Sequence, residues 1–411
     1  EGNRSYFSII SLYGFSSGES QLAASEQELG KSADISANDI NIIPATLGVA
    51  KGLGKRRNDG VFDHAIAFSL LVPSLQVSSL VEETGGKCAN DKGDSEFHVQ
   101  RSINDRTLWT GLGYGWRVNN WLNLGTSAFY VLRSFERIDD SSSACITNSR
   151  DLQQARFNSN STSLRFSNGN LVLQVGAKAR VSDRFSLGVS VGSPSLRLNS
   201  EGKLSGVRTG TDSLPGAGCD TKNSKNMPFF CSPTSQATKS ETRLPLLVRF
   251  GAAYVVPKRL TAALDFSFHG PVEYQLFATE NEPDANQLPI LSNVERKPVV
   301  NINIGLEYLL EEEISASVGA FTNFSSAPDI PNSPNSEMLP NIDLYGFSAA
   351  AGYFTEHSLL RIGFLYSFGF GHDVLPAERE PGTDLSFDPK YQRIDFSKNY
   401  LYLFVASTFR Y

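Results

Sequence analysis

The chain has 411 residues, a formal net charge of −6 at pH 7 and 40% hydrophobic residues. This acidic balance, with no basic tract, argues against nucleic acid as a partner. No apolar run approaches the roughly 18 to 20 residues that a membrane-spanning helix needs, so the chain either is soluble or crosses a membrane as strands. Gly (34), Phe (27) and Tyr (14) are abundant and Met (2) is scarce, which favours strands and turns over helix bundles.

About fourteen strands are predicted from the pattern of apolar residues and turn residues. In the first half they cover 4–15, 40–53, 62–81, 97–118, 121–137, 163–181 and 185–198. In the second half they cover 243–256, 260–277, 294–310 and 314–324, followed by two strands that meet at 355–358 and a closing strand over 399–411. The longest irregular segment is expected over 199–241.

The connections between these strands alternate strictly between long and short. Tight turns such as Asn119-Asn120 and Glu311-Glu312-Glu313 alternate with long polar loops such as 325–340. Bacterial outer-membrane barrels have an even number of strands, short periplasmic turns and long extracellular loops. We therefore predict an all-β fold, in which residues 1–411 form a single transmembrane antiparallel β-barrel of about 14 strands in the bacterial outer membrane.

Side chains within the strands alternate between large apolar residues and small or polar ones. Over 294–310, Val300, Ile302 and Ile304 alternate with Asn301 and Asn303. A water-soluble barrel would bury the large apolar row inside, and a barrel lined by the small row would be hollow. Lipid around the large apolar row resolves this. Outer-membrane lipid and lipopolysaccharide are therefore the expected surroundings.

The closing strand ends on an aromatic residue, Tyr411, and has two distinct faces. One face is mostly apolar, as the lipid-facing side of a closing barrel strand should be. The other face carries Tyr400, Tyr402 and Phe404. These aromatics are expected to make the upper lumen apolar, where a water channel would be polar.

Proline and cysteine mark two further features. Pro73 lies inside the third strand, and since proline removes a ladder hydrogen bond, a break, bulge or edge is expected there. All four cysteines lie in polar segments, which is typical of an oxidising compartment. The simplest of three pairings joins Cys219 to Cys231 and Cys88 to Cys145.

The segments Asn41-Ile42-Ile43-Pro44-Ala45-Thr46-Leu47-Gly48 and Ala67-Phe68-Ser69-Leu70-Leu71-Val72-Pro73-Ser74 resemble the FadL/TodX family of outer-membrane transporters for long-chain fatty acids and other hydrophobic compounds. In that family an N-terminal hatch with an Asn-Pro-Ala motif plugs the barrel, and a kink in the third strand opens a lateral path. The given sequence contains no Asn-Pro-Ala, so the hatch is expected to be absent from it. Pro73 falls where the kink would lie.

The resemblance implies a transporter that binds a hydrophobic small molecule in the upper lumen and releases it sideways into the membrane. The ligand-binding residues expected there are Phe404, Tyr402 and Tyr400, with Phe129 and Val131 as second choices. Inward-facing charged residues are expected to form ion pairs in the lumen: Arg117, Lys178, Arg180, Arg249, Asp265, Glu307, Arg361 and Arg410.

The sequence is also compatible with other kinds of outer-membrane barrel. One is a structural or accessory barrel that partners an envelope or secretion complex, and another is a general porin. An enzyme is disfavoured because a hydrolase needs a nucleophile with an oriented base, whereas the five histidines (His64, His98, His269, His357 and His372) are scattered along the chain. The one candidate is His269, which is inward on its strand near Asp265, and an ion-paired or solvated histidine is the simpler interpretation. No metal site or cofactor is expected, since Cys-x-x-Cys spacing is missing.

Overall fold

The computed structural model describes residues 5–21, 34–56, 62–87, 93–149, 152–210, 229–278, 293–334, 338–376 and 391–410. Within these ranges the regular elements are strands. No helix of this part of the chain is long and apolar enough to cross a membrane. The all-β prediction is confirmed.

The strands of the first half are β1 (Ser5–Gln21), β2 (Asp34–Arg56), β3 (Phe62–Lys87), β4 (Gly93–Arg117), β5 (Leu122–Ser149), β6 (Leu152–Arg180), β7 (Phe185–Gly192), β8 (Leu196–Gly210), β9 (Phe229–Ser240) and β10 (Leu247–Val256). The second half contains β11 (Leu260–His269), β12 (Val272–Gln275), β13 (Phe277–Ala278), β14 (Asn293–Arg296), β15 (Val299–Leu309), β16 (Ile314–Asn323), β17 (Asn341–Phe354), β18 (Ser358–Pro376) and β19 (Tyr391–Arg410).

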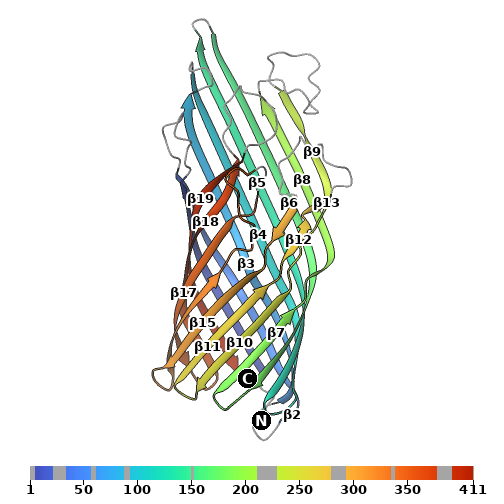
Figure 1. Ribbon diagram of the computed structural model, residues 1–411, viewed down its shortest axis with the longest axis vertical. Helices are drawn as coiled ribbons and strands as arrows, with labels where there is room; N and C mark the ends of the chain where they lie inside the picture. Colours follow the sequence, from blue (N-terminus) through green and yellow to red (C-terminus); the bar gives the residue numbers. More distant parts are fainter. Residues whose placement is uncertain are drawn as a thin grey trace.

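These segments form a closed antiparallel barrel of 14 strands. Several wall strands are interrupted, so that β7 continues as β8, β9 as β10, β11 as β12 and β13, and β14 as β15. Each wall strand pairs with the next along the chain, and β19 pairs with β1 along its length. Figure 1 shows both chain ends at the end of the barrel that carries the short turns.

The outer face of the barrel is a belt of exposed apolar side chains. On the strands whose side chains are described, residues of one parity point outward, for example Val300, Ile302 and Ile304 on β15, which are 48%, 41% and 58% exposed. Exposed aromatics stand close to the short turns: Trp116, Trp121, Tyr254, Tyr308 and Tyr353. An apolar belt flanked by aromatic rings is the outer surface that lipid requires.

Strands β4 to β6 extend far beyond this belt (Figure 1). β5 has 28 residues and β6 has 29, although about 9 to 11 residues are enough to cross a bilayer. The prediction of an irregular segment over 199–241 was wrong, because β8 runs to Gly210 and β9 covers Phe229–Ser240. Above the belt both faces of a strand meet polar surroundings, so the alternation that reveals a strand in sequence is lost.

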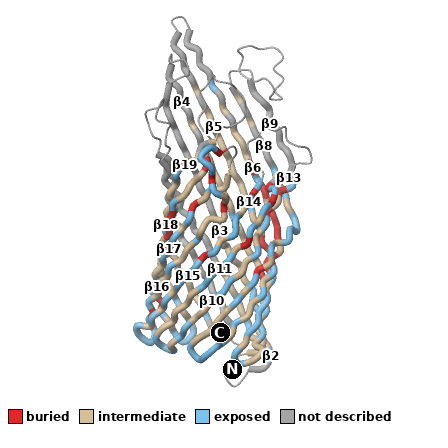
Figure 2. The backbone as a smooth tube through the Cα atoms, viewed as in Figure 1, coloured by how far each residue is buried: buried red, intermediate tan, exposed pale blue. Residues whose placement is uncertain are grey.

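Interruptions of the wall bring chain segments into the lumen. β12 pairs with β14 in a separate two-stranded sheet. Tyr274 of β12 and Val294 of β14 pack against Leu164 and Phe166 on the inner face of β6. Figure 2 shows buried residues gathered near β13 and β14 and near β18, while the lower wall alternates between exposed and intermediate residues. The lumen therefore has its own packed interior at mid-height.

Candidate functional site

An apolar cluster, the lumen cluster, lines the lumen at mid-height. Its buried members are Phe129, Val131 and Val172, and the partly buried Leu71, Trp109 and Leu244 pack against them. Strand pairing produces this arrangement, because Val131 lies opposite Trp109 and Phe129 opposite Val172, and directly opposed residues share one face of a sheet.

The ring of Phe129 lies flat against the wall because the residue opposite it is glycine. A Cβ atom on Gly111 would overlap the Phe129 ring. Phe129 and Trp109 meet edge to face, with ring centroids 5.6 Å apart and planes inclined by 61°. The prediction that Phe129 and Val131 face inward agrees with their burial, at 9% and 2% exposed; their role in ligand binding stays a prediction.

Charged groups lie immediately above the lumen cluster, toward the long loops. The Arg133 guanidinium donates to Asp105 through Nε (3.0 Å to Oδ1) and Nη2 (2.7 Å to Oδ2). Its carbon Cζ lies 5.7 Å from the centroid of the Phe135 ring and 5.4 Å from that of Phe166. Arg133 is therefore neutralised by a bidentate pair and stacked on aromatic rings.

Backbone pairing between β2 and β3 ends beside the lumen cluster. Among the described residues their ladder runs from the Arg56–Phe62 pair to the Thr46–Leu71 pair and stops there. Beyond it, β3 shifts register against β4 between Leu71 and Ser74. Residues 34–44 of β2 continue in pairing with β1. Leu71 is thus both the last β3 residue paired with β2 and a member of the lumen cluster.

Two prolines stand at this point. Pro73 lies within the register shift of β3, where a break or bulge was expected. Pro44 lies opposite Ser11 of β1 at a register shift of β2. Neither proline has an N–H group to continue a ladder. Both belong to the segments quoted for the family resemblance, but sequence reasoning assigned a break to Pro73 alone.

Tyr400, Tyr402 and Phe404 line another part of the inner wall. The rings of Tyr400 and Tyr402 stack with centroids 6.1 Å apart and planes inclined by 11°. Phe404 lies against Gly363 of β18, where an added Cβ would come within 2.7 Å of the ring. No described contact joins these residues to Phe129 or Val131, so a shared ligand site stays a prediction.

The expected lumen ion pairs are found in part. Glu307 and Arg361 form one at 2.6 Å, and Ser315 also donates to Glu307 at 3.0 Å. No cluster of three or more His, Cys, Asp or Glu side chains able to hold a metal ion occurs in the described part of the chain.

The side chains of the four cysteines in the predicted disulfides are not among those that the structure describes. Cys88 and Cys219 lie outside the described residues. Of Cys145 and Cys231 only the backbone is described, in β5 and β9. The two pairings stay predictions.

Neither a family model nor a curated protein matches the sequence. Solved structures do match. A FadL homologue from Pseudomonas aeruginosa has a TM-score of 0.59 and 12% identity over 99% of this chain and 90% of its own. The Pseudomonas putida toluene transporter TodX has a TM-score of 0.53 and 13% identity over 100% and 90%. The chain has a FadL/TodX-like fold.

In this FadL/TodX-like barrel the residues that converge come from distant parts of the sequence. Leu71, Trp109, Val172 and Leu244 were not singled out by sequence reasoning. For Trp109 a signal existed, because it shares the parity of the inward Gly111. Leu244 had none, since it lies in the segment between β9 and β10 that turns toward the lumen.

Proposed function

We propose that this protein is a bacterial outer-membrane transporter for hydrophobic compounds. Its short turns would face the periplasm and its long strand extensions the outside. A ligand would bind at the lumen cluster and leave sideways into the membrane between β2 and β3. The observation that supports this best is the double position of Leu71, in the lumen cluster and at the end of the β2–β3 ladder.

Binding at the lumen cluster would be driven by removal of apolar surface from water, at roughly 25 cal/mol per Å². A general porin needs a polar, water-filled lumen, which buried Phe129, Val131 and Val172 do not provide. The proposal therefore favours a compound carried by partition over a solute carried in water.

Lateral release needs a place where the wall is not closed by backbone hydrogen bonds. A barrel has no free strand edges along a regular ladder. Pro44 and Pro73 remove donors where the β2–β3 ladder stops. An apolar molecule leaving there would enter lipid directly and avoid the polar surface layer of lipopolysaccharide.

The substrate class follows from the charges around the lumen cluster. Arg133 lies two residues from Val131 on the inner face of β5, and because it is paired with Asp105 it is not free to attract an anion. We infer that uncharged hydrophobic compounds are carried in preference to long-chain fatty acids, whose carboxylates Arg133 would not attract while it is paired with Asp105. Tyr400, Tyr402 and Phe404 would extend the apolar path in the upper lumen.

The proposal is tested by the entry of phenylnaphthylamine, a dye that fluoresces in lipid, into vesicles with lipopolysaccharide in the outer leaflet. Vesicles containing the protein should take up the dye faster than empty ones. Val172→Thr, of equal shape, should slow uptake, because burying its hydroxyl costs about 1 to 3 kcal/mol. Val172→Asp should abolish it.

Ser127→Asp is the matched control, since Ser127 is on the same inner face of β5 but outside the lumen cluster. It should leave dye uptake unchanged. Release of trapped glucose at the rate of dye entry would show a porin instead. An unchanged rate of dye uptake by the Val172→Asp variant would contradict the proposal.

A further inference from the structure

Two asparagines on the inner face of β6, Asn168 and Asn170, are both buried but differ in their partners. They are 0% and 2% exposed. With its amide nitrogen turned toward Ser240, Asn168 donates to the backbone oxygens of Ser240 and Ser167, each at 3.2 Å. Asn168 therefore ties β6 to β9 and serves the fold.

Asn170 uses only one end of its amide. Its Nδ2 donates to Thr242 Oγ1 at 3.3 Å. Its Oδ1 is buried and has no hydrogen-bond partner among the described residues. A buried acceptor without a donor is unfavourable, and the great majority of such groups in proteins are paired.

The surroundings of Asn170 are those of the lumen cluster. Val131 lies directly opposite it on β5, and Val172 lies two residues further along the same face of β6. Both valines are buried members of the lumen cluster. An unpaired carbonyl oxygen thus lies in the wall of an otherwise apolar site.

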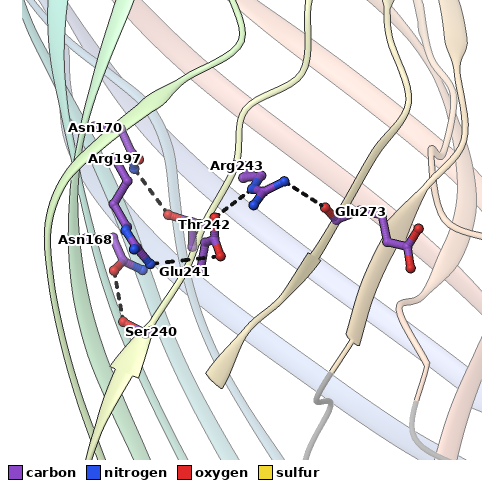
Figure 3. A network of polar contacts seen from close by, with 8 residues as sticks. All are labelled: Asn168, Asn170, Arg197, Ser240, Glu241, Thr242, Arg243 and Glu273. Carbon is purple, nitrogen blue, oxygen red and sulfur yellow. Dashed lines mark hydrogen bonds and ion pairs between the residues drawn. The ribbon is translucent and has the colours of Figure 1, made fainter. Parts of the chain in front are cut away.

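The orientation of the Asn170 amide is held by a fixed segment (Figure 3). Thr242 stands between Glu241 and Arg243, which pair with each other at 2.6 Å. Arg197 of β8 lies 3.9 Å from Glu241, and Arg243 also donates to the backbone oxygen of Glu273 at 3.5 Å. These contacts fix Thr242, which keeps Nδ2 engaged and leaves Oδ1 as the free end.

We propose that Asn170 Oδ1 accepts a hydrogen bond from a ligand hydroxyl, so that the protein selects hydroxylated hydrophobic compounds such as phenols and alkanols over hydrocarbons. This inference rests on the proposed function, because it assumes a ligand at the lumen cluster. The rest of the ligand would contact Val131, Val172 and Phe129.

The test compares three ligands of one ring size: toluene, para-cresol, which adds a donor, and para-methylanisole, which adds only an acceptor. Binding is followed by the fluorescence of Trp109 in the purified barrel after Trp116→Phe and Trp121→Phe, since those two tryptophans are exposed on the outer face. Asn170→Leu should raise the ratio of the dissociation constant of cresol to that of toluene about fivefold. This is the change in affinity expected from the loss of one hydrogen bond. The methylanisole ratio should fall or stay the same.

Asn303→Leu is the matched control, because Asn303 is an inward amide of β15 away from the lumen cluster, and it should change neither ratio. Asn170→Ala replaces the leucine variant if that one does not fold. An unchanged cresol ratio with toluene still bound overturns this inference alone. If Asn170→Leu instead raises the dissociation constant of methylanisole relative to that of toluene, the amide nitrogen of Asn170 faces the lumen. That result also overturns the inference. Failure of every ligand to affect Trp109 refutes the proposed function instead.

Discussion

Removal of the Arg133 guanidinium should destabilise the barrel strongly, and removal of both members of its ion pair should not. Arg133→Met leaves the Asp105 carboxylate without the two hydrogen bonds of 3.0 and 2.7 Å that it now accepts. Asp105→Leu combined with Arg133→Met leaves two apolar side chains beside Phe135 and Phe166, which already flank the guanidinium.

The expected magnitude follows from the burial of the pair. Breaking a fully buried ion pair costs about 3 to 5 kcal/mol. The two side chains are 25% and 20% exposed, so screening by water reduces this to about 2 to 3 kcal/mol. The two ring contacts add about 0.5 to 1 kcal/mol each. Arg133→Met alone should therefore cost about 3 to 5 kcal/mol. The double variant should lose only the ring contacts, about 1 to 2 kcal/mol, so the coupling energy of the double-mutant cycle should be well above about 2 kcal/mol.

The assay is reversible urea unfolding of the barrel in lipid vesicles, with folded and unfolded protein separated by gel migration. The matched control is the outward pair Arg165–Glu136, which also joins adjacent strands but is 62% and 37% exposed. Its coupling energy should stay below about 1 kcal/mol. Equal coupling energies for the two pairs would refute the reasoning that Arg133 is held in a desolvated lumen.

Two further predictions concern packing and pH. Gly346→Ala should lower the free energy of unfolding by about 1 to 3 kcal/mol, because the added Cβ would overlap the Phe321 ring. Gly115→Ala should change it by less than about 0.5 kcal/mol, because no atom lies within 4 Å of the added Cβ. Equal unfolding midpoints for the two variants would contradict this. Lys297, whose Nζ lies 3.0 Å from Asp329, lowers the pKa of that loop carboxyl below 3.8. The stabilisation by the Lys297–Asp329 contact is therefore fully present at pH values above the ordinary pKa of an aspartate. It is lost as the pH falls through the lowered pKa of Asp329. Lys297→Gln should raise the Asp329 pKa toward 3.8 in a carboxyl NMR titration, and an unchanged midpoint would contradict the assignment.

The wall of the barrel could be predicted from sequence because lipid imposes a simple rule on it. Every outward residue in the belt must be apolar, so rows such as Val300, Ile302 and Ile304 reveal strand, face and parity together. This rule does not apply above the belt, where no lipid requires the outward residues to be apolar. This is why the upper part of β6 and the whole of β9 were missed, although they are regular strands.

Residues of the candidate site could be predicted only where they occupy inward positions of a regular wall strand. Phe129 and Val131 were identified as inward residues on this basis, and they are buried. The contact of Leu71 and Leu244 with them depends on strands that are distant in sequence and on a segment that turns inward. The free acceptor of Asn170 depends on where Thr242 is placed, and no local pattern encodes that.

Deletion of Pro73 would show whether a hydrophobic compound leaves the barrel sideways between β2 and β3. Two residues of β3, Val72 and Pro73, now occupy the space opposite Leu108 of β4, and deletion of one would restore a regular register and allow β2 and β3 to pair further. The deletion variant should still bind toluene, as seen by Trp109 fluorescence, but vesicles that contain it should take up phenylnaphthylamine no faster than vesicles without protein. Unchanged dye uptake by a folded deletion variant would contradict lateral release between β2 and β3.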